Sequence, residues 1–348
     1  MFVVRAVKKD DLDGLYNLSL KSESGLTTLP KHKPSLKDSI ARSLAAFKSK
    51  KPLEGKHNYL FVMEELATGK VVGTSAIIAG IGLDQPFYCY RLLHQTLVSN
   101  EPKMRIDTEL LQLSNDFVGA TEIATLFLDP EYRKGNLGKL LAKARYLFIA
   151  AHSERFSDKV MSEIRGWVDE NEDSPFWEAL GRHFFGMSFK EADAINGQGN
   201  NQFIGDMMPK FPIYTSLLPE SARAVLGKPH DNAMAAFKLL EKEGFRFSGA
   251  VDIFDAGPEM EVHKRGILTV RLTNRGKVGG TVEGGQQQEK TLIANPSIDK
   301  FAVVLSNVVE TDSGSWIPER HAEILGLKVE DDICYAPLKR SGERRSDI

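Results

Sequence analysis

The spacing of apolar positions divides the first half of the chain into short strands and amphipathic helices. Runs of four to eight apolar or alternating residues are typical of strands, whereas apolar residues three or four positions apart are typical of helices. The strands and extended segments expected on this basis lie at residues 2–6, 59–66, 71–81, 85–97, 110–113 and 120–128. The expected helices cover residues 12–20, 35–49 and 139–151.

The same pattern continues in the second half, where a strand, a helix and a further strand are expected. Residues 159–168 are strand-like, and residues 245–254 read as a later strand. The helix between them begins after Asp231, a good N-cap residue, and ends at Gly244, a typical residue beyond a helix end. A long insertion, about residues 171–228, separates these blocks and is helical and aromatic in places.

From about residue 266 the pattern changes to short strands, which predicts a separate unit. They are expected at residues 267–272, 278–282, 291–294, 301–309 and 333–336. No helix follows the glycines between them, so these glycines are interpreted as hairpin turns: Gly276, Gly279, Gly280, Gly284 and Gly285. We therefore expect a core domain at 1–265, a small β-barrel-like domain at 266–338, and a mobile tail at 339–348.

Composition and charge narrow the class of protein. The chain has 348 residues and a formal net charge of −2, which gives no general attraction to nucleic acid or anionic membranes. Cys89 and Cys334 are far apart and form no metal or redox motif. The N-terminus has no apolar signal segment, and no apolar run reaches the ~20 residues of a membrane span. These features predict a cytoplasmic protein without a nucleic-acid or membrane partner.

The most informative segment is the basic loop between the strand at 120–128 and the following helix. Its sequence, RKGNLG at 133–138, places glycines and cations where a helix begins, an arrangement suited to phosphate groups. A nucleotide P-loop is excluded because Leu140 replaces the hydroxyl residue that should follow Gly138-Lys139. A dinucleotide fingerprint is excluded because only two glycines are present, with a different spacing. The candidate ligand-binding residues of this segment are Leu128, Arg133, Lys134, Gly135, Asn136, Leu137 and Gly138.

This loop resembles the acyl-CoA loop of the GNAT acyltransferases, Arg/Gln-x-x-Gly-x-Gly. Arg133 and Gly138 match, whereas Asn136 stands at the first glycine and Gly135 lies one position earlier. The helix end at 240–245, LEKEGF, resembles the Tyr-Glu-Lys-x-Gly-Phe segment of these enzymes, with Leu240 in place of the tyrosine that protonates the departing thiolate. The nearest titratable replacement is His230.

Longer segments resemble the arginine N-succinyltransferase family over nearly the whole chain. The segments that carry the resemblance are GLTTLP at 25–30, EIATLFLDPEYRKGNLGKLL at 122–141, SPFWEALGRHFF at 174–185, PIYTSLLP at 212–219, VLGKPHDN at 225–232, LLEKEGF at 239–245 and VDIFDAGP at 251–258. The chain departs from the family pattern at Ala124, at residues 204–210, and at Ala233 and Met234.

The resemblance implies an α+β fold with a GNAT-like core, in which helices flank a mixed central sheet. It implies succinyl transfer from succinyl-CoA to the α-amino group of L-arginine, the first step of a succinyl route of arginine breakdown. His230 would be the proton donor, and Leu126 would contact succinyl-CoA. No permanently bound cofactor or metal site is implied, and the chain is expected to form a homo-oligomer or to assemble with a paralogous chain.

Several alternatives stay open at this stage. A related acyltransferase could act on ornithine or use another acyl-CoA, and a non-catalytic partner subunit would carry much of the same sequence. A guanidinium group requires carboxylates, for which the candidates are Glu163, Asp169, Glu170, Asp252 and Asp255. The succinyl carboxylate requires a cation or hydroxyl, for which Arg165 and Arg182 are the candidates.

Overall fold

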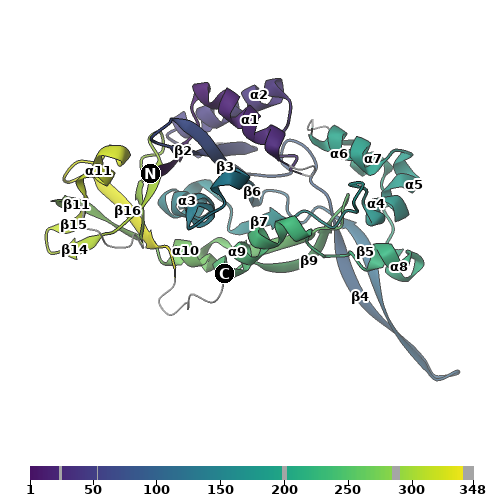
Figure 1. Cartoon of the computed structure of the whole chain (residues 1–348). Coiled ribbons are helices and arrows are strands. Elements are labelled where there is room, and N and C mark those ends of the chain that lie inside the picture. The colour runs from purple at the N-terminus through teal and green to yellow at the C-terminus, as the bar shows by residue number, and fades with distance from the viewer. Residues whose placement is uncertain (23–25, 53, 198–201, 284–290, 340–348) are drawn as a thin grey trace.

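The computed structural model describes residues 1–22, 26–52, 54–197, 202–283 and 291–339. Within these residues, 16 strands form one mixed sheet in the order β14-β15-β11-β16-β12-β13-β1-β2-β3-β6-β7-β10-β9-β4-β5-β8 (Figure 1). The pairs β6–β7 and β11–β15 are parallel, and the other pairs of described strands are antiparallel. Helices flank this sheet, so the predicted fold class is confirmed.

The boundaries of the elements follow the predicted pattern closely in the first half. The strands are β1 Phe2–Ala6, β2 His57–Glu65, β3 Lys70–Ala79, β4 Cys89–Ser99, β5 Met104–Ser114, β6 Thr121–Leu128, β7 Lys159–Glu163, β8 Ile213–Tyr214, β9 Arg246–Asp252, β10 Pro258–His263, β11 Asn274–Val282, β12 Thr291–Asn295, β13 Ala302–Ser306, β14 Val309–Thr311, β15 Gly314–Pro318 and β16 Asp332–Pro337. The helices are α1 Leu12–Lys21, α2 Lys33–Lys48, α3 Leu137–Ala151, α4 Pro175–Ala179, α5 Gly181–Phe185, α6 Phe189–Gly197, α7 Gln202–Met207, α8 Glu220–Arg223, α9 Met234–Glu243, α10 Leu268–Arg271 and α11 Glu319–Leu325.

Alternation along β2 builds two cores on opposite faces of the sheet. Tyr59 and Phe61 join the core that contains α3, whereas Leu60 and Val62 join the core beneath α1 and α2. Successive side chains of a strand point to opposite faces, which is why one strand serves both cores. In Figure 1, α1 and α2 accordingly lie on the other side of β2 and β3 from α3.

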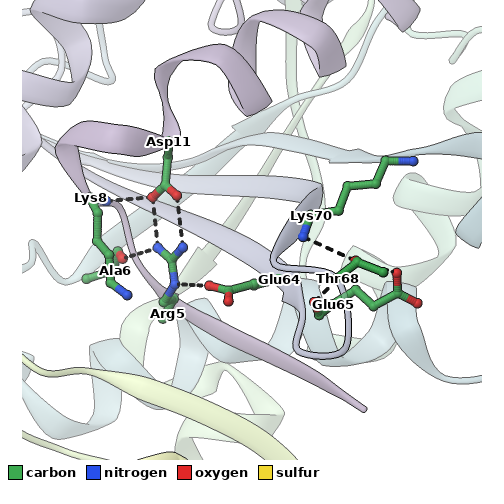
Figure 2. Close-up of polar contacts among 8 residues, drawn as sticks. All are labelled: Arg5, Ala6, Lys8, Asp11, Glu64, Glu65, Thr68 and Lys70. Carbon is green, nitrogen blue, oxygen red and sulfur yellow. Dashed lines mark hydrogen bonds and ion pairs between the residues drawn. The ribbon is translucent and has the colours of Figure 1, made fainter.

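An ion-pair network fixes β1 against its neighbours (Figure 2). The Arg5 guanidinium donates to both carboxylate oxygens of Asp11 at 2.8 Å and, through Nε, to Glu64 at 2.6 Å. Asp11 also accepts from the backbone N–H of Lys8 at 2.6 Å. The network joins β1, the start of α1 and β2, so the first strand is held by side chains as well as by its sheet bonds.

The region around β4, β5 and β9 carries the long insertion. A second buried cluster, which includes Tyr90, Phe176 and Trp177, packs the insertion helices α4 to α8 against the bases of these strands. Beyond this cluster, β4 and β5 continue together as a long arm that projects away from the body (Figure 1). Leu97, Met104 and Ile106 on this arm are exposed.

Two predictions for the C-terminal part are wrong. The segment 267–272 contains the helix α10, Leu268–Arg271, rather than a strand. Gly276, Gly279 and Gly280 lie within β11 rather than in hairpin turns. A Cβ at Gly280 would come within 2.7 Å of the Trp316 ring, and one at Gly279 within 2.4 Å of the Ser313 carbonyl oxygen. These glycines therefore permit close approach to β15 and the turn before it. Gly284, Gly285 and residues 340–348 of the predicted tail lie outside the described residues.

The C-terminal strands are continuous with the core sheet, because β13 pairs with β1. The domain boundaries at 265/266 and 338/339 remain predictions. In the described part of the chain, no helix is both long enough and apolar enough to cross a membrane.

Candidate active site

A cleft of about 330 Å³ opens where β6 and β7 separate. The two strands pair in parallel only at Thr121–Val160 and Glu122–Met161, and the Ser162 hydroxyl then donates to the Ile123 carbonyl at 2.8 Å. Beyond this level the strands diverge, and residues from both line the cleft together with residues of α1, α3, α6, α9 and β9. The end of β6 and the start of α3 therefore face the same cavity.

A bulge in β6 lies in the wall of this cleft. Thr74 and Ala76 of β3 pair with Phe127 and Ala124, so two residues of β6, Thr125 and Leu126, oppose the single residue of β3 between them. Thr125 has φ of 56°, a left-handed conformation that is costly for a β-branched residue. A bulge interrupts the regular ladder and turns backbone groups away from the neighbouring strand. The strand is thus distorted where it faces the cavity.

The predicted basic loop adopts the predicted local structure. A short 3₁₀ turn at Pro130–Tyr132 follows β6, and α3 then begins at Leu137 with Asn136 as its N-cap residue. The Asn136 side chain does not cap the helix. Helix starts leave backbone N–H groups without intrahelical acceptors, so the start of α3 retains its capacity for an anion. Gly138 has open space where a Cβ would stand.

Arg133 connects the loop to the cleft. Its Nε donates to the Leu128 carbonyl at 3.0 Å, and its guanidinium lies 5.6 Å from the centre of the Phe127 ring. This places a fixed cation at the end of β6 and in the cleft lining. Other cations line the same cavity: Lys21, Lys139, Lys143, Arg145, Arg165 and Lys242. Lys143 pairs with Glu243 at 2.7 Å.

Carboxyl groups gather on the other side of the bulge and form what we call the acidic cluster. Its members come from β6, β7, β9, β10 and the turn after β9, and they are Glu122, Glu163, Asp252, Asp255 and Glu259. Oxygen atoms of Glu163, Asp252 and Glu259 lie within 4.8 Å of one another. Glu163 and Asp252 line the cleft, and Glu259 is fully buried behind them. The cleft thus has a cationic end around the start of α3 and an acidic end, where Arg165 lies close to the carboxyl groups.

Burial changes the titration of the acidic cluster. It raises the pKa of Asp255 and Glu259 well above the usual range, and the neighbouring carboxylates raise these pKa values further. Asp255 offsets part of its burial by accepting the backbone N–H groups of Gly166 at 2.7 Å and Gly257 at 2.8 Å. Within the described residues, neither oxygen of Glu259 accepts a hydrogen bond.

The pH dependence of stability should report this burial. Because the pKa of Glu259 is higher in the folded protein than its unfolded value of about 4.3, the folded state binds more protons between the two values. The free energy of unfolding therefore falls as the pH rises through that range. We expect Glu259→Gln to remove this penalty and to raise the melting temperature relative to the parent protein more at pH 9 than at pH 5.

Melting curves recorded at both pH values would measure this effect. Glu170→Gln, at an exposed position outside the cleft lining, is the matched control. Its melting temperature should equal that of the parent protein at both pH values. A Glu259→Gln shift that is independent of pH would contradict the expectation.

His230 lies beside the cleft. Its backbone N–H donates to the carbonyl of Arg165 at 2.8 Å, and Arg165 and Asn232 line the cleft. Its Nδ1 accepts the backbone N–H of Asn232 at 3.2 Å, so His230 caps the 3₁₀ turn that leads into α9. Asp231 was predicted to supply this cap, and that prediction is wrong. An acceptor at Nδ1 places the proton of the neutral ring at Nε2.

The structure brings together only some of the predicted site residues. Leu126 and Arg133 line the cleft, and so do Glu163, Arg165, Asp252 and Asp255. Leu128 is buried in the core beneath α3. Lys134, Gly135, Asn136, Leu137 and Gly138 form the loop and helix start next to the cleft without lining it. Asp169, Glu170 and Arg182 lie outside the lining.

Sequence reasoning missed several residues at this site. Tyr146 on α3 lines the cleft, and burial raises the pKa of its phenol, which keeps it protonated and able to donate. Glu122 and Glu259 also belong to the acidic cluster; Glu122 stands in an otherwise apolar strand, whereas Glu259 shares β10 with Glu261 and His263. A charged residue within an otherwise apolar strand was the available signal, since such residues are rarely buried without a reason.

Comparisons with known proteins point to one family. Residues 2–269 match a family model described as arginine N-succinyltransferase beta subunit. An arginine N-succinyltransferase of Enterobacter sp. (strain 638) is 42% identical over 340 residues, which cover 97% of this chain and 98% of that relative. One from Escherichia coli O17:K52:H18 is 41% identical over 317 residues, 90% of each chain.

A solved structure is also similar over its whole length. It is the arginine/ornithine succinyltransferase subunit AI from Pseudomonas aeruginosa, with 30% sequence identity and a TM-score of 0.88. The match covers 98% of this chain and 99% of that one.

Proposed function

Because the chain belongs to the arginine N-succinyltransferase family, we propose that it transfers a succinyl group from succinyl-CoA to the α-amino group of L-arginine. The products are CoA and N²-succinyl-L-arginine. The observation that best supports this activity is the two-ended cleft, with cations around the start of α3, carboxylates at the other end, and a strand bulge between them. No metal and no permanently bound cofactor is required by this reaction.

The cationic end suits the phosphate groups of CoA. The start of α3 offers backbone N–H groups and the positive end of the helix dipole, and Arg133 and Lys139 add charge beside it. With the phosphates at this end, the thioester extends along β6 toward Leu126. We therefore expect the phosphate side of the cosubstrate to be held by Arg133, Lys134, Gly135, Asn136, Leu137 and Gly138, and its acyl side to contact Leu126.

The bulge in β6 is suited to stabilise the oxyanion that forms during acyl transfer. Attack of the amine converts the thioester carbonyl into a tetrahedral oxyanion, which backbone N–H groups stabilise when they point at that oxygen. Thr125 and Leu126 are the residues of β6 that leave the regular ladder in the cleft wall. The cost of the left-handed Thr125 is consistent with a conformation retained for this purpose.

His230 is proposed as the proton donor. The C–N bond forms as the C–S bond breaks, the departing sulfur takes a proton, and the attacking nitrogen releases one. With Nδ1 accepting from Asn232, the Nε2–H group of the neutral ring can donate a hydrogen bond to the departing sulfur, and the proton that the sulfur takes up is balanced by the one that the attacking nitrogen releases. Leu240, which replaces the tyrosine expected in GNAT enzymes, is buried and cannot donate.

Release of free thiol from succinyl-CoA, with and without L-arginine, tests this function. We expect release that depends on arginine, with N²-succinyl-L-arginine as the detected product. Ornithine in place of arginine is the comparison to make, because the similar Pseudomonas protein is described as an arginine/ornithine succinyltransferase. No release from a sample that binds CoA would instead favour a non-catalytic partner subunit.

We further propose that the chain forms oligomers in the cytoplasm, the partner being a second copy of this chain. An isolated two-stranded ribbon is marginally stable in water, yet the β4–β5 arm exposes Leu93, Leu97, Met104 and Ile106 on one face. Contact with the same face of a second copy would cover these side chains. Both cysteines are unpaired, in agreement with a reducing compartment. Sedimentation velocity of the purified chain tests the oligomer directly.

A further inference from the structure

The acidic cluster has no part in the transfer steps described above, yet it occupies one end of the cleft. We infer that Glu163, Asp252 and Glu259 bind the guanidinium group of the acyl acceptor and so select arginine. This inference rests on the proposed function, because it identifies how the substrate's side chain is held while its α-amino group reacts.

The three carboxyl groups are arranged around one point. They come from β7, β9 and β10, which are neighbours in the sheet, and their oxygens lie within 4.8 Å of one another. A guanidinium is planar, permanently charged and carries five N–H donors, so it can serve more than one carboxylate at once. Glu163 and Asp252 line the cleft, so a ligand that enters from the cavity reaches them directly.

Glu259 gives independent support for a cationic ligand. Its side chain is 0% exposed, and both of its oxygens lack a hydrogen-bond donor among the described residues. Buried polar groups are nearly always hydrogen-bonded, and an unsatisfied carboxylate is costly. One oxygen of Glu259 lies within 4.8 Å of an oxygen of Glu163 and of one of Asp252, so a cation at this point would favour the ionised form of all three groups. A group that brings both donors and positive charge satisfies all three.

The spacing between the bulge and the cluster fits the length of arginine. The last contact between β6 and β7 joins Ser162 to Ile123, so Glu163, the next residue of β7, stands where the strands begin to diverge, two to three residues or roughly 7–10 Å before Leu126 along the strand direction. The α-nitrogen and the guanidinium carbon of an extended arginine are separated by six bonds of about 1.5 Å, or roughly 7 Å end to end. The amine can therefore meet the thioester at the bulge while the guanidinium lies at the carboxylates.

Isothermal calorimetry in the presence of CoA, after dialysis against a chelator, tests the inference with L-arginine and L-citrulline. Citrulline has nearly the same shape but an uncharged end group. We expect the parent protein to bind arginine much more tightly than citrulline. Glu163→Gln, and separately Glu259→Gln, should weaken arginine binding about 10- to 100-fold, the scale of a charged hydrogen bond, and leave citrulline binding nearly unchanged. Glu170→Gln is the matched control and should bind as the parent does.

Four outcomes overturn the inference. The first is an unchanged arginine affinity in both cluster variants, and the second is an equal loss of affinity for arginine and citrulline. The third is arginine binding that requires added Mg²⁺ or Ca²⁺, and the fourth is a parent protein that does not prefer arginine to citrulline. The first excludes these carboxylates as the site, the second indicates a general role in the reaction or in folding, and the third indicates a metal site. Thiol release measured in the same samples tests the proposed function independently of arginine binding at the acidic cluster. Arginine binding at the cluster without arginine-dependent thiol release would refute the transfer activity alone.

Discussion

Replacement of His230 by Asn should lower kcat by ~10²–10⁴ while leaving the affinity for CoA nearly unchanged, the range expected when a general acid or base is removed. That factor corresponds to about 3–5 kcal/mol of barrier height. The expectation rests on the position of the ring: its backbone donates to Arg165 in the cleft lining, and its Nδ1 is held by Asn232. Steady-state rates of thiol release and CoA binding by calorimetry measure the two quantities separately.

Two further variants separate catalysis from capping. Asn is itself a good N-cap residue, so His230→Asn preserves an acceptor for the Asn232 N–H, whereas His230→Ala should also lose roughly 1 kcal/mol of stability. Both variants should lose activity to a similar extent. His183→Ala, at an exposed histidine outside the cleft lining, is the matched control and should retain the parental rate. An unchanged kcat in His230→Asn would remove His230 from catalysis and direct attention to the Tyr146 phenol.

Replacement of Gly138 by Glu should abolish succinyl-CoA binding. Gly138 lies in the first turn of α3, and the space where its Cβ would stand is empty, so the fold can accommodate a side chain there. A carboxylate at this position would occupy the anion site and repel the phosphate groups that we place beside it. Calorimetric titration with CoA measures the loss, which we expect to exceed 100-fold.

Gly138→Ala is the informative control for this prediction. It adds a methyl group without charge at a helical position, so binding and folding should both be retained. If Gly138→Glu binds CoA with normal affinity, the loop at 133–138 is not the phosphate site. If the alanine variant loses binding as well, steric contact rather than charge is responsible, and the electrostatic argument fails.

Periodicity in the sequence predicted the first half of the fold well, because its strands and helices are locally determined. The strand at 2–6 and the end of α3 at 151 are confirmed to the residue. The failures lie where distant contacts decide the structure. Gly279 and Gly280 are required because β15 and its preceding turn approach them closely, and nothing near them in the sequence shows this. Residues 267–272 have strand-like composition, yet they form α10 against α3 and α9.

The predictions for the site also succeeded where nearby sequence marks a residue and failed where distant contacts decide its position. The loop and His230 were found because each is marked by nearby sequence, a glycine-containing basic turn and a resemblance to a known family. The choice among five candidate carboxylates needed the sheet order, which brings β7, β9 and β10 together and leaves Asp169 to accept two N–H groups of its own turn. His230 rather than Asp231 is the cap: its Nδ1 accepts the Asn232 N–H, and its own backbone N–H bonds the Arg165 carbonyl.

The pairing of β1 with β13 has a consequence for how the protein is made. Val4 lies opposite Val303, so β1 leaves the ribosome roughly 300 residues before β13, which pairs with it. At 5–20 residues per second this delay is roughly 15–60 s. During that time β1 can pair with β2, but its other edge is open to other chains, the condition that favours aggregation. Nascent chains truncated before β13 should therefore depend on chaperones, and the C-terminal strands act as the closing segment of the N-terminal fold.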